Sequence, residues 1–341
     1  MGILDWFKNR PEKFDPHSVS YETTEQCIDK AVTLTNPRLK LISSYRERLT
    51  PAVENSMRYV CGVVATLPDS IHVSSSQWSV SPALRAFFVS ARDVSEVLSR
   101  SQNLRTFFNK YPFIDRAHLV LGMAYEEQRT FGMSIRGDIV QRDVAQTVVG
   151  FSDHKARICG ETNQEVRRLL GIQLYEYLLA QALSEIGEER NERQELEGNR
   201  ALIRARLRLL RQQGPGLGTV FGSAPAWVEE QVRLEAQLLE NEREMEAMGS
   251  PDSALAHELD CLCAVLEAPE RYIRVESREI KLNSMNVVLE KASAGAAADT
   301  EFSLVHLQGV PAMRRAFVLA TFDRSEMQEV RKNFDRVGNS L

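Results

Sequence analysis

No segment of this chain has the roughly 18 consecutive apolar residues that a membrane-spanning helix needs. The most apolar stretch, from Tyr59 to Pro68, is too short to cross a bilayer. Residues 1–10 also lack the apolar core and the small-residue cleavage site of a secretory signal. These absences predict a protein without a transmembrane segment, and we expect it in the cytoplasm.

Cysteine is scarce as well, and its distribution argues against disulfide bonds. The cysteines are odd in number and widely separated: Cys27, Cys61, Cys159, Cys261 and Cys263. Small domains held together by disulfides instead have even numbers of closely spaced cysteines. The sequence therefore predicts free thiols in a reducing compartment.

The chain has no excess of positive charge. Its formal net charge is −5 and its pI is about 5.8, while 43% hydrophobic and 26% charged residues are the ordinary mixture of a globular protein. Arginines gather in residues 200–211, but no aromatic residues are interleaved with them. We therefore expect no nucleic-acid partner.

Catalytic and metal-binding motifs are missing too. The histidines show no His-Glu-x-x-His spacing, Cys261 and Cys263 do not form Cys-x-x-Cys, and neither Gly-x-Ser-x-Gly nor Gly-Lys-Ser/Thr occurs. Glycines crowd residues 214–222, but this stretch follows a predicted helix, whereas a dinucleotide-binding loop follows a buried strand. The sequence predicts no cofactor and no metal, and it favours a non-enzymatic role.

Residues 1–115 have a helical pattern. Thr23 and Gln26 have the spacing of a capping box, which predicts a helix over about 24–34. The serine-rich stretch 71–81 is predicted as a loop or an edge strand. Further helix starts are predicted where a capping residue precedes proline, at Asn36-Pro37, Thr50-Pro51 and Ser81-Pro82.

Two later segments have strand patterns. In residues 116–161 apolar stretches with a two-residue period alternate with polar or glycine-containing segments, which predicts an antiparallel meander. In residues 269–341, the nearly continuous apolar run Ala316 to Phe322 suits a strand covered on both faces. Ser325 and Gln328 predict a short terminal helix. We expect the two segments to share one sheet.

Between the strand-rich segments the sequence predicts a long helical hairpin. A capping box at Thr162 and Glu165 begins a proline-free segment long enough for one helix of about 50 residues. Apolar residues recur at heptad spacing in two groups, which a polar segment (187–195) separates. The first group is Ile172, Leu179 and Ile186, and the second is Leu196, Ile203 and Leu210, with Leu207 between its last two members. A second helix begins near Ala226, and its predicted apolar face consists of Val228, Val232, Leu238, Leu239 and Met245.

Charge supports the pairing of these two helices. Residues 200–211 contain five arginines, whereas residues 229–246 contain seven glutamates and two arginines. Antiparallel packing would neutralise both segments. The predicted fold class is therefore α+β: a helical region (1–115), an antiparallel β meander (116–161), a coiled-coil hairpin inserted at 162–268 with its tip at 214–225, and a strand-rich segment (269–341) that completes the β platform.

Apolar residues without an evident core mark two candidate partner-binding segments. A loop tip that carries large apolar side chains is typical of a docking surface, and a short amphipathic start suits a groove or, more weakly, a membrane surface. The candidate residues are Leu217, Val220 and Phe221 at the tip and Ile3, Leu4, Trp6 and Phe7 at the start.

The function that these patterns favour is a non-enzymatic interaction or scaffold protein that uses the hairpin to hold an unidentified protein partner. Self-association is a further option, because a first helix of about 50 residues exceeds a return helix of about 22. The alternative is an enzyme or small-ligand binder with a polar pocket on the meander, formed by Arg129, Asp138, Asp153, His154 and Arg157.

Overall fold

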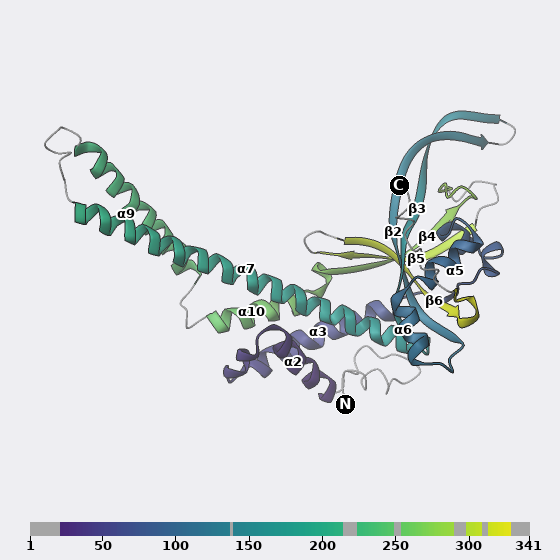
Figure 1. Cartoon of the computed structure of the whole chain (residues 1–341), viewed down its shortest axis with the longest axis horizontal. Helices are drawn as coiled ribbons and strands as arrows, with labels where there is room; N and C mark the ends of the chain where they lie inside the picture. The colour runs from purple at the N-terminus through teal and green to yellow at the C-terminus, as the bar shows by residue number, and fades with distance from the viewer. Residues whose placement is uncertain are drawn as a thin grey trace, which may run out of the picture. The chain divides into compact units, whose positions relative to one another are not determined.

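The structure, a computed structural model, describes residues 21–136, 139–213, 224–248, 254–289, 298–308 and 313–328 (Figure 1). Over these ranges no helix combines the length and the apolar character that crossing a membrane requires. The chain mixes helices with an antiparallel sheet, so the α+β fold class is confirmed.

The chain divides into two compact units. The sheet unit is made from Met57–Glu176 and the described part of Pro269–Leu341, and the helical unit from Ser20–Ser56 and Tyr177–Ala268. The helical unit thus combines the hairpin region with residues from the N-terminal helical region. Two long helices, α3 (Tyr45–Ala65) and α7 (Asn163–Gln213), contribute residues to both units.

One sheet organises the sheet unit. Its strands lie in the order β3-β2-β6-β5-β4, and the short β1 pairs in parallel with β6. The two strand-rich segments therefore share one sheet, because β2 pairs with β6 from Arg116 and Asp323 to Ala124 and Arg315. The strands are β1 (Ile71–His72), β2 (Arg116–Arg136), β3 (Ile139–Gly160), β4 (Ile273–Leu282), β5 (Ala298–Leu307) and β6 (Met313–Asp323).

The predicted meander of several short strands is wrong: residues 116–136 and 139–160 form two long paired strands, β2 and β3. The polar interruptions in the sequence are β-bulges rather than turns. At the three register shifts β3 carries residues with positive φ, namely Asp143, Asp153 and Ile158. A bulge inserts one unpaired residue, so it breaks the two-residue period without ending the strand.

Short helices cover one face of this sheet. They are α4 (Pro82–Phe87), α5 (Ala91–Ser99) and α6 (Gln102–Lys110). Each begins after a serine whose side chain accepts a hydrogen bond from the first turn, which confirms the helix predicted at Ser81. The core beneath them includes a group of aromatic rings, Phe87, Tyr125, Phe151 and Phe302.

The opposite face has a smaller core formed by Leu67, Val120, Val166, Phe317 and Leu319. Val166 belongs to the first turns of α7. Nearby, the guanidinium of Arg167 donates hydrogen bonds to the carbonyl oxygens of Val64, Leu67 and Pro68. The start of α7 is thereby fixed to the segment that follows α3.

Three further sequence predictions have mixed outcomes. Pro51 does not begin a helix but lies inside α3, where the buried Leu49, Ala52 and Val53 offset the one backbone hydrogen bond that proline removes. Asn36 caps a 3-10 helix, η1 (Pro37–Leu41), as its position before proline predicts. Near Ser325 the structure has a 3-10 helix, η5 (Arg324–Glu326).

The helical unit contains α2 (Tyr21–Thr35), α9 (Ala224–Ala247) and α10 (Ala254–Glu267) together with most of α7. Contacts along α7 run in the opposite direction to the chain of α9 and α10. The Arg204 guanidinium lies 2.8 Å from a Glu242 carboxylate oxygen, Arg193 donates to the Met248 carbonyl, and Arg190 lies 2.7 Å from Glu258. The predicted long helix and its antiparallel return are therefore present, and α10 continues the return.

A buried ionic network joins three helical elements of this unit. Glu258 of α10 is only 8% exposed. Its carboxylate accepts hydrogen bonds from Arg190 of α7, at 2.7 Å, and from the Nδ2 amide of Asn36. Hydrogen bonds from Arg190 and Asn36 lower the pKa of Glu258 below its usual 4.5, against the opposing effect of burial. The same Asn36 caps η1, so the network fixes η1, α7 and α10 together.

Replacing Glu258 with glutamine should therefore make stability less dependent on pH. We expect Glu258→Gln to lower the free energy of unfolding at about pH 7 by about 1–2 kcal/mol, because a charged hydrogen bond is lost. A carboxylate whose pKa is lowered by folding stabilises the protein above its unfolded pKa, and this contribution disappears as pH falls through the folded pKa. Urea unfolding at about pH 7 and about pH 3 should show the difference between wild type and variant shrinking.

The matched control is Glu188→Gln, which removes an exposed carboxylate from α7. It should change the free energy of unfolding by less than about 0.5 kcal/mol at either pH. A difference between Glu258→Gln and wild type that is equally large at both pH values would contradict the role of the Glu258 charge.

Candidate functional site

The outer surface of α7 carries an exposed apolar stripe beyond its packing face. Leu202 is 58% exposed and Leu209 is 55% exposed, although Leu207 between them is buried. A spacing of seven residues places the two leucines on the same side of the helix. Exposed arginines, Arg206 and Arg208, stand on either side of this stripe. We call these four residues the α7 face.

Helix α9 has a corresponding stripe with the opposite charge. Val232 is 60% exposed and Leu239 is 53% exposed, again seven residues apart, whereas Leu234 is buried. Exposed Glu235 and Glu240 flank this stripe, and Arg243 on the same side of the helix pairs with Glu240 at 3.4 Å. We call Val232, Leu239 and these two glutamates the α9 face.

Helical geometry places the two faces on opposite sides of the hairpin. The Arg204–Glu242 ion pair marks one side of the seam between the helices. Successive helical residues are rotated by about 100°, so Leu202 and Leu209 project from α7 in nearly the opposite direction to Arg204. Val232 and Leu239 instead project from α9 in roughly the same direction as Glu242. The hairpin therefore presents two separate apolar surfaces, one bordered by arginine and one mainly by glutamate.

The sequence patterns located only part of this arrangement. Val232 and Leu239 were expected on the packing face of the second helix, and that assignment is wrong. The packed positions are instead Leu234 and Asn241, which are 2% and 5% exposed. The buried Asn241 amide donates to the Leu196 carbonyl at 3.1 Å. Because this packing position is occupied by a polar residue, a search for apolar residues alone does not find the heptad repeat of the packed face.

All of the partner-binding residues predicted from the sequence lie outside the residues that the structure describes. They are Leu217, Val220 and Phe221 at the predicted hairpin tip, and Ile3, Leu4, Trp6 and Phe7 at the start of the chain. They stay predictions.

His154 is the least exposed of the described residues that were predicted to form the alternative polar pocket. Its ring stacks on Phe88, with ring centroids 4.5 Å apart, and its Nε2 lies 2.8 Å from the Phe87 carbonyl oxygen. Because a carbonyl only accepts, Nε2 carries the proton and donates it. Burial lowers the pKa of His154. This histidine joins β3 to the residues at the end of α4.

The other described members are distributed along the β2–β3 hairpin. Asp153 is exposed, and its carboxylate pairs with Arg315 at 2.8 Å and with Lys155 at 2.9 Å. These two cations lower the pKa of Asp153. Arg129 pairs with Thr147, whereas Arg157 pairs with Val120, so the two arginines are about 30 Å apart along the strands. Asp138 lies outside the described residues.

Metal-ligating and thiol groups offer little reactive chemistry. Among the residues that the structure describes, no three His, Cys, Asp or Glu side chains come together in a way that would hold a metal ion. All five cysteines are free. Burial raises the pKa of Cys27 and Cys159 to about 12, which keeps these thiols protonated and unreactive.

Comparison of the chain with known protein families, with curated proteins and with solved structures finds no match. The two faces of the α7/α9 hairpin are therefore judged on their geometry and charge.

The position of His154 predicts a pH-dependent contribution to stability. We expect His154→Phe to keep the ring stacking but to lower the free energy of unfolding at about pH 7 by about 1 kcal/mol, because the Phe87 carbonyl loses its donor. Since folding lowers the pKa of His154 below 6.5, wild type loses stability as pH falls through that range. The difference between the two proteins should therefore narrow from about pH 7 to about pH 5.

Urea unfolding across this pH range measures the effect, with the exposed His257→Phe as the control. Some dependence on pH remains in the variant because burial also lowers the pKa of His118. A difference that stays constant between the two pH values would contradict the assignment of a neutral, partly buried His154.

Proposed function

We propose that this protein is a non-enzymatic scaffold that assembles with further copies of itself through the α7/α9 hairpin. The observation that carries the proposal is the complementarity of the two hairpin faces. Each has an apolar stripe at heptad spacing, and the charges that border the two stripes are mainly of opposite sign.

The α7 face of one copy complements the α9 face of another in both its apolar and its charged residues. Leu202 and Leu209 would pack against Val232 and Leu239 in the manner of a helical seam. Arg206 and Arg208 would then face Glu235 and Glu240, which gives the contact its direction and its preference for the correct partner face.

Two different faces on opposite sides of one hairpin imply a head-to-tail interface. Such an interface leaves one face free at each end of every assembly, so copies add until a ring closes or a filament forms. This differs from the self-association expected from the sequence, which relied on α7 being longer than its return helix. In the structure α10 also packs along α7, so that reason no longer applies.

A scaffold role also suits the chemistry of the described residues. The polar groups with the strongest partners, such as Glu258 and Asp153, are already used in ion pairs within the chain. We place this scaffold in the cytoplasm, on the basis of the odd and scattered cysteines of the sequence. An enzyme or ligand binder that uses the polar residues of β2 and β3 remains the alternative prediction.

A variant with one face blocked should not assemble by itself, but a mixture of two variants with different faces blocked should still associate. We expect wild type to form species larger than dimers as its concentration rises, measured by sedimentation velocity. The double variants Leu202→Glu/Leu209→Glu and Val232→Glu/Leu239→Glu should each stay monomeric. Burial of a leucine contributes about 1.5–3 kcal/mol, so the loss of two weakens the contact by about 100-fold or more.

Mixing the two double variants provides the sharpest control. Each retains one intact face, so together they should form a one-to-one dimer that grows no further. An exposed pair of changes on α7 far from both faces, Glu188→Gln with Glu189→Gln, should leave assembly intact. A wild type that stays monomeric at all concentrations, or a mixture that gives no dimer, would overturn the proposal.

A further inference from the structure

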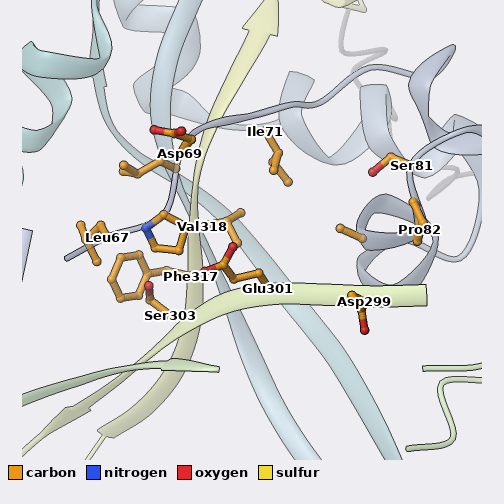
Figure 2. Close-up of a pocket in the computed structure, with 13 residues that line it drawn as sticks. Leu67, Asp69, Ile71, Ser81, Pro82, Asp299, Glu301, Ser303, Phe317 and Val318 are labelled. Carbon is orange, nitrogen blue, oxygen red and sulfur yellow. The ribbon is translucent and has the colours of Figure 1, made fainter. Parts of the chain in front are cut away.

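A cavity of about 260 Å³ lies in the sheet unit where β5 separates from β6 (Figure 2). β5 pairs with β6 from Leu307 only as far as Ser303, opposite Phe317, and β1 joins the same edge of β6 at Ala320. Val318 and Leu319 lie between these two pairings and line the cavity. The opening is therefore a consequence of strand register, not of a missing side chain.

The inner wall of this cavity is apolar except for one hydroxyl. Leu67, Phe317 and Leu319, each less than 10% exposed, belong to the smaller core of the sheet unit and also line the cavity. Ser303 lies beside them and is only 2% exposed. Its hydroxyl has no hydrogen-bond partner among the described residues, so it is available to pair with a molecule in the cavity.

Carboxylates form the rim. Asp69, Asp299 and Glu301 line the cavity, and Figure 2 shows Glu301 on the same strand as Ser303, close to Phe317. Asp299 has Lys281 at 3.7 Å, but within the described part of the chain neither Asp69 nor Glu301 forms an ion pair.

The neighbouring strand, β4, neutralises part of this charge beside Asp299, through Lys281, but adds to it beside Glu301. Glu279 of β4 stands directly opposite Glu301 of β5 in the register. Like charges at directly opposed positions destabilise a sheet, and together they create a negative potential at the mouth of the cavity. An apolar cavity with a few convergent polar groups is the usual form of a small-molecule site.

We propose that this cavity binds an organic cation: an ammonium or guanidinium group on an apolar stem. The stem lies against Phe317, Leu319 and Leu67, the charged head meets Glu301 and Asp69, and a polar atom of the ligand pairs with the Ser303 hydroxyl. A metal ion is not the occupant, since no three acidic or other ligating side chains of the described chain are placed to hold one. This inference does not rest on the assembly of the hairpin.

The test compares ligands that share a stem but differ in charge. Hexylamine and hexanoate are titrated separately into the full chain, and methyl NMR follows Leu67, Val318 and Leu319. We expect hexylamine to shift these signals saturably and hexanoate to leave them unchanged. Binding should weaken as salt is raised, because the rim carboxylates are exposed and therefore screened.

Two variants assign the charge. Glu301→Gln should weaken hexylamine binding by roughly fivefold, as expected for one exposed ion pair, whereas Glu126→Gln on the β2–β3 hairpin makes the same charge change elsewhere and should have no effect. The inference would be overturned if neither ligand gave a saturable shift, if hexanoate bound as well as hexylamine, or if Glu301→Gln bound hexylamine like wild type.

A third ligand distinguishes the two sources of such a cation. Lysine with both its amino and carboxyl ends capped presents the same ammonium on a stem that belongs to a peptide. Tighter binding of capped lysine than of hexylamine would identify the natural ligand as a basic side chain of a protein. Tighter binding of hexylamine would identify it as a free amine.

Discussion

The pairing of β2 with β6 is the constraint on which the sheet unit depends. It joins strands whose residues are separated along the chain by the whole helical hairpin, from Arg116 with Asp323 to Ala124 with Arg315. The entropy lost in closing so long a loop grows only slowly with its length, so a large insertion is tolerated. What the pairing requires is a strand that is apolar on both sides. β6 satisfies this, because Val318 and Ala320 contribute to one core and Phe317 and Leu319 to the other.

Because β6 is buried on both faces, helices from different parts of the chain pack against the two sides of the sheet. Residues 82–110 supply α4 to α6 on one face, and the first turns of α7 supply Val166 on the other. The burial of β6 on both faces ends where β5 stops pairing with β6. Beyond Ser303 the β5 strand pairs only with β4, and the edge of β6 is continued by β1. A cavity at that position combines core residues with surface carboxylates because both kinds of residue belong to the same diverging strands.

Local signals in the sequence predicted most elements but not their extent. Serine before proline predicted α4, and the Thr162 box predicted the start of α7, because capping depends on residues only three apart. The long β2–β3 hairpin was misread as several strands because Asp143, Asp153 and Ile158 bulge out of β3, and a bulge looks like a turn when the partner strand is unknown. The cavity had no sequence signal, since it arises from the relative register of β5, β6 and β1.

The hairpin shows how a polar residue can reverse the assignment of a helix face. With Asn241 in the seam, Leu234 and Asn241 are buried while Val232 and Leu239 are exposed. A buried asparagine in a heptad lowers stability but specifies register, so its presence is understandable only if alignment of the two helices matters. Two helices alone are also too narrow to cover apolar residues on their outer sides. Exposed stripes at heptad spacing with opposite charge borders therefore favour a hairpin that is completed by a neighbouring helix, and the matching face of the same chain has the required chemistry.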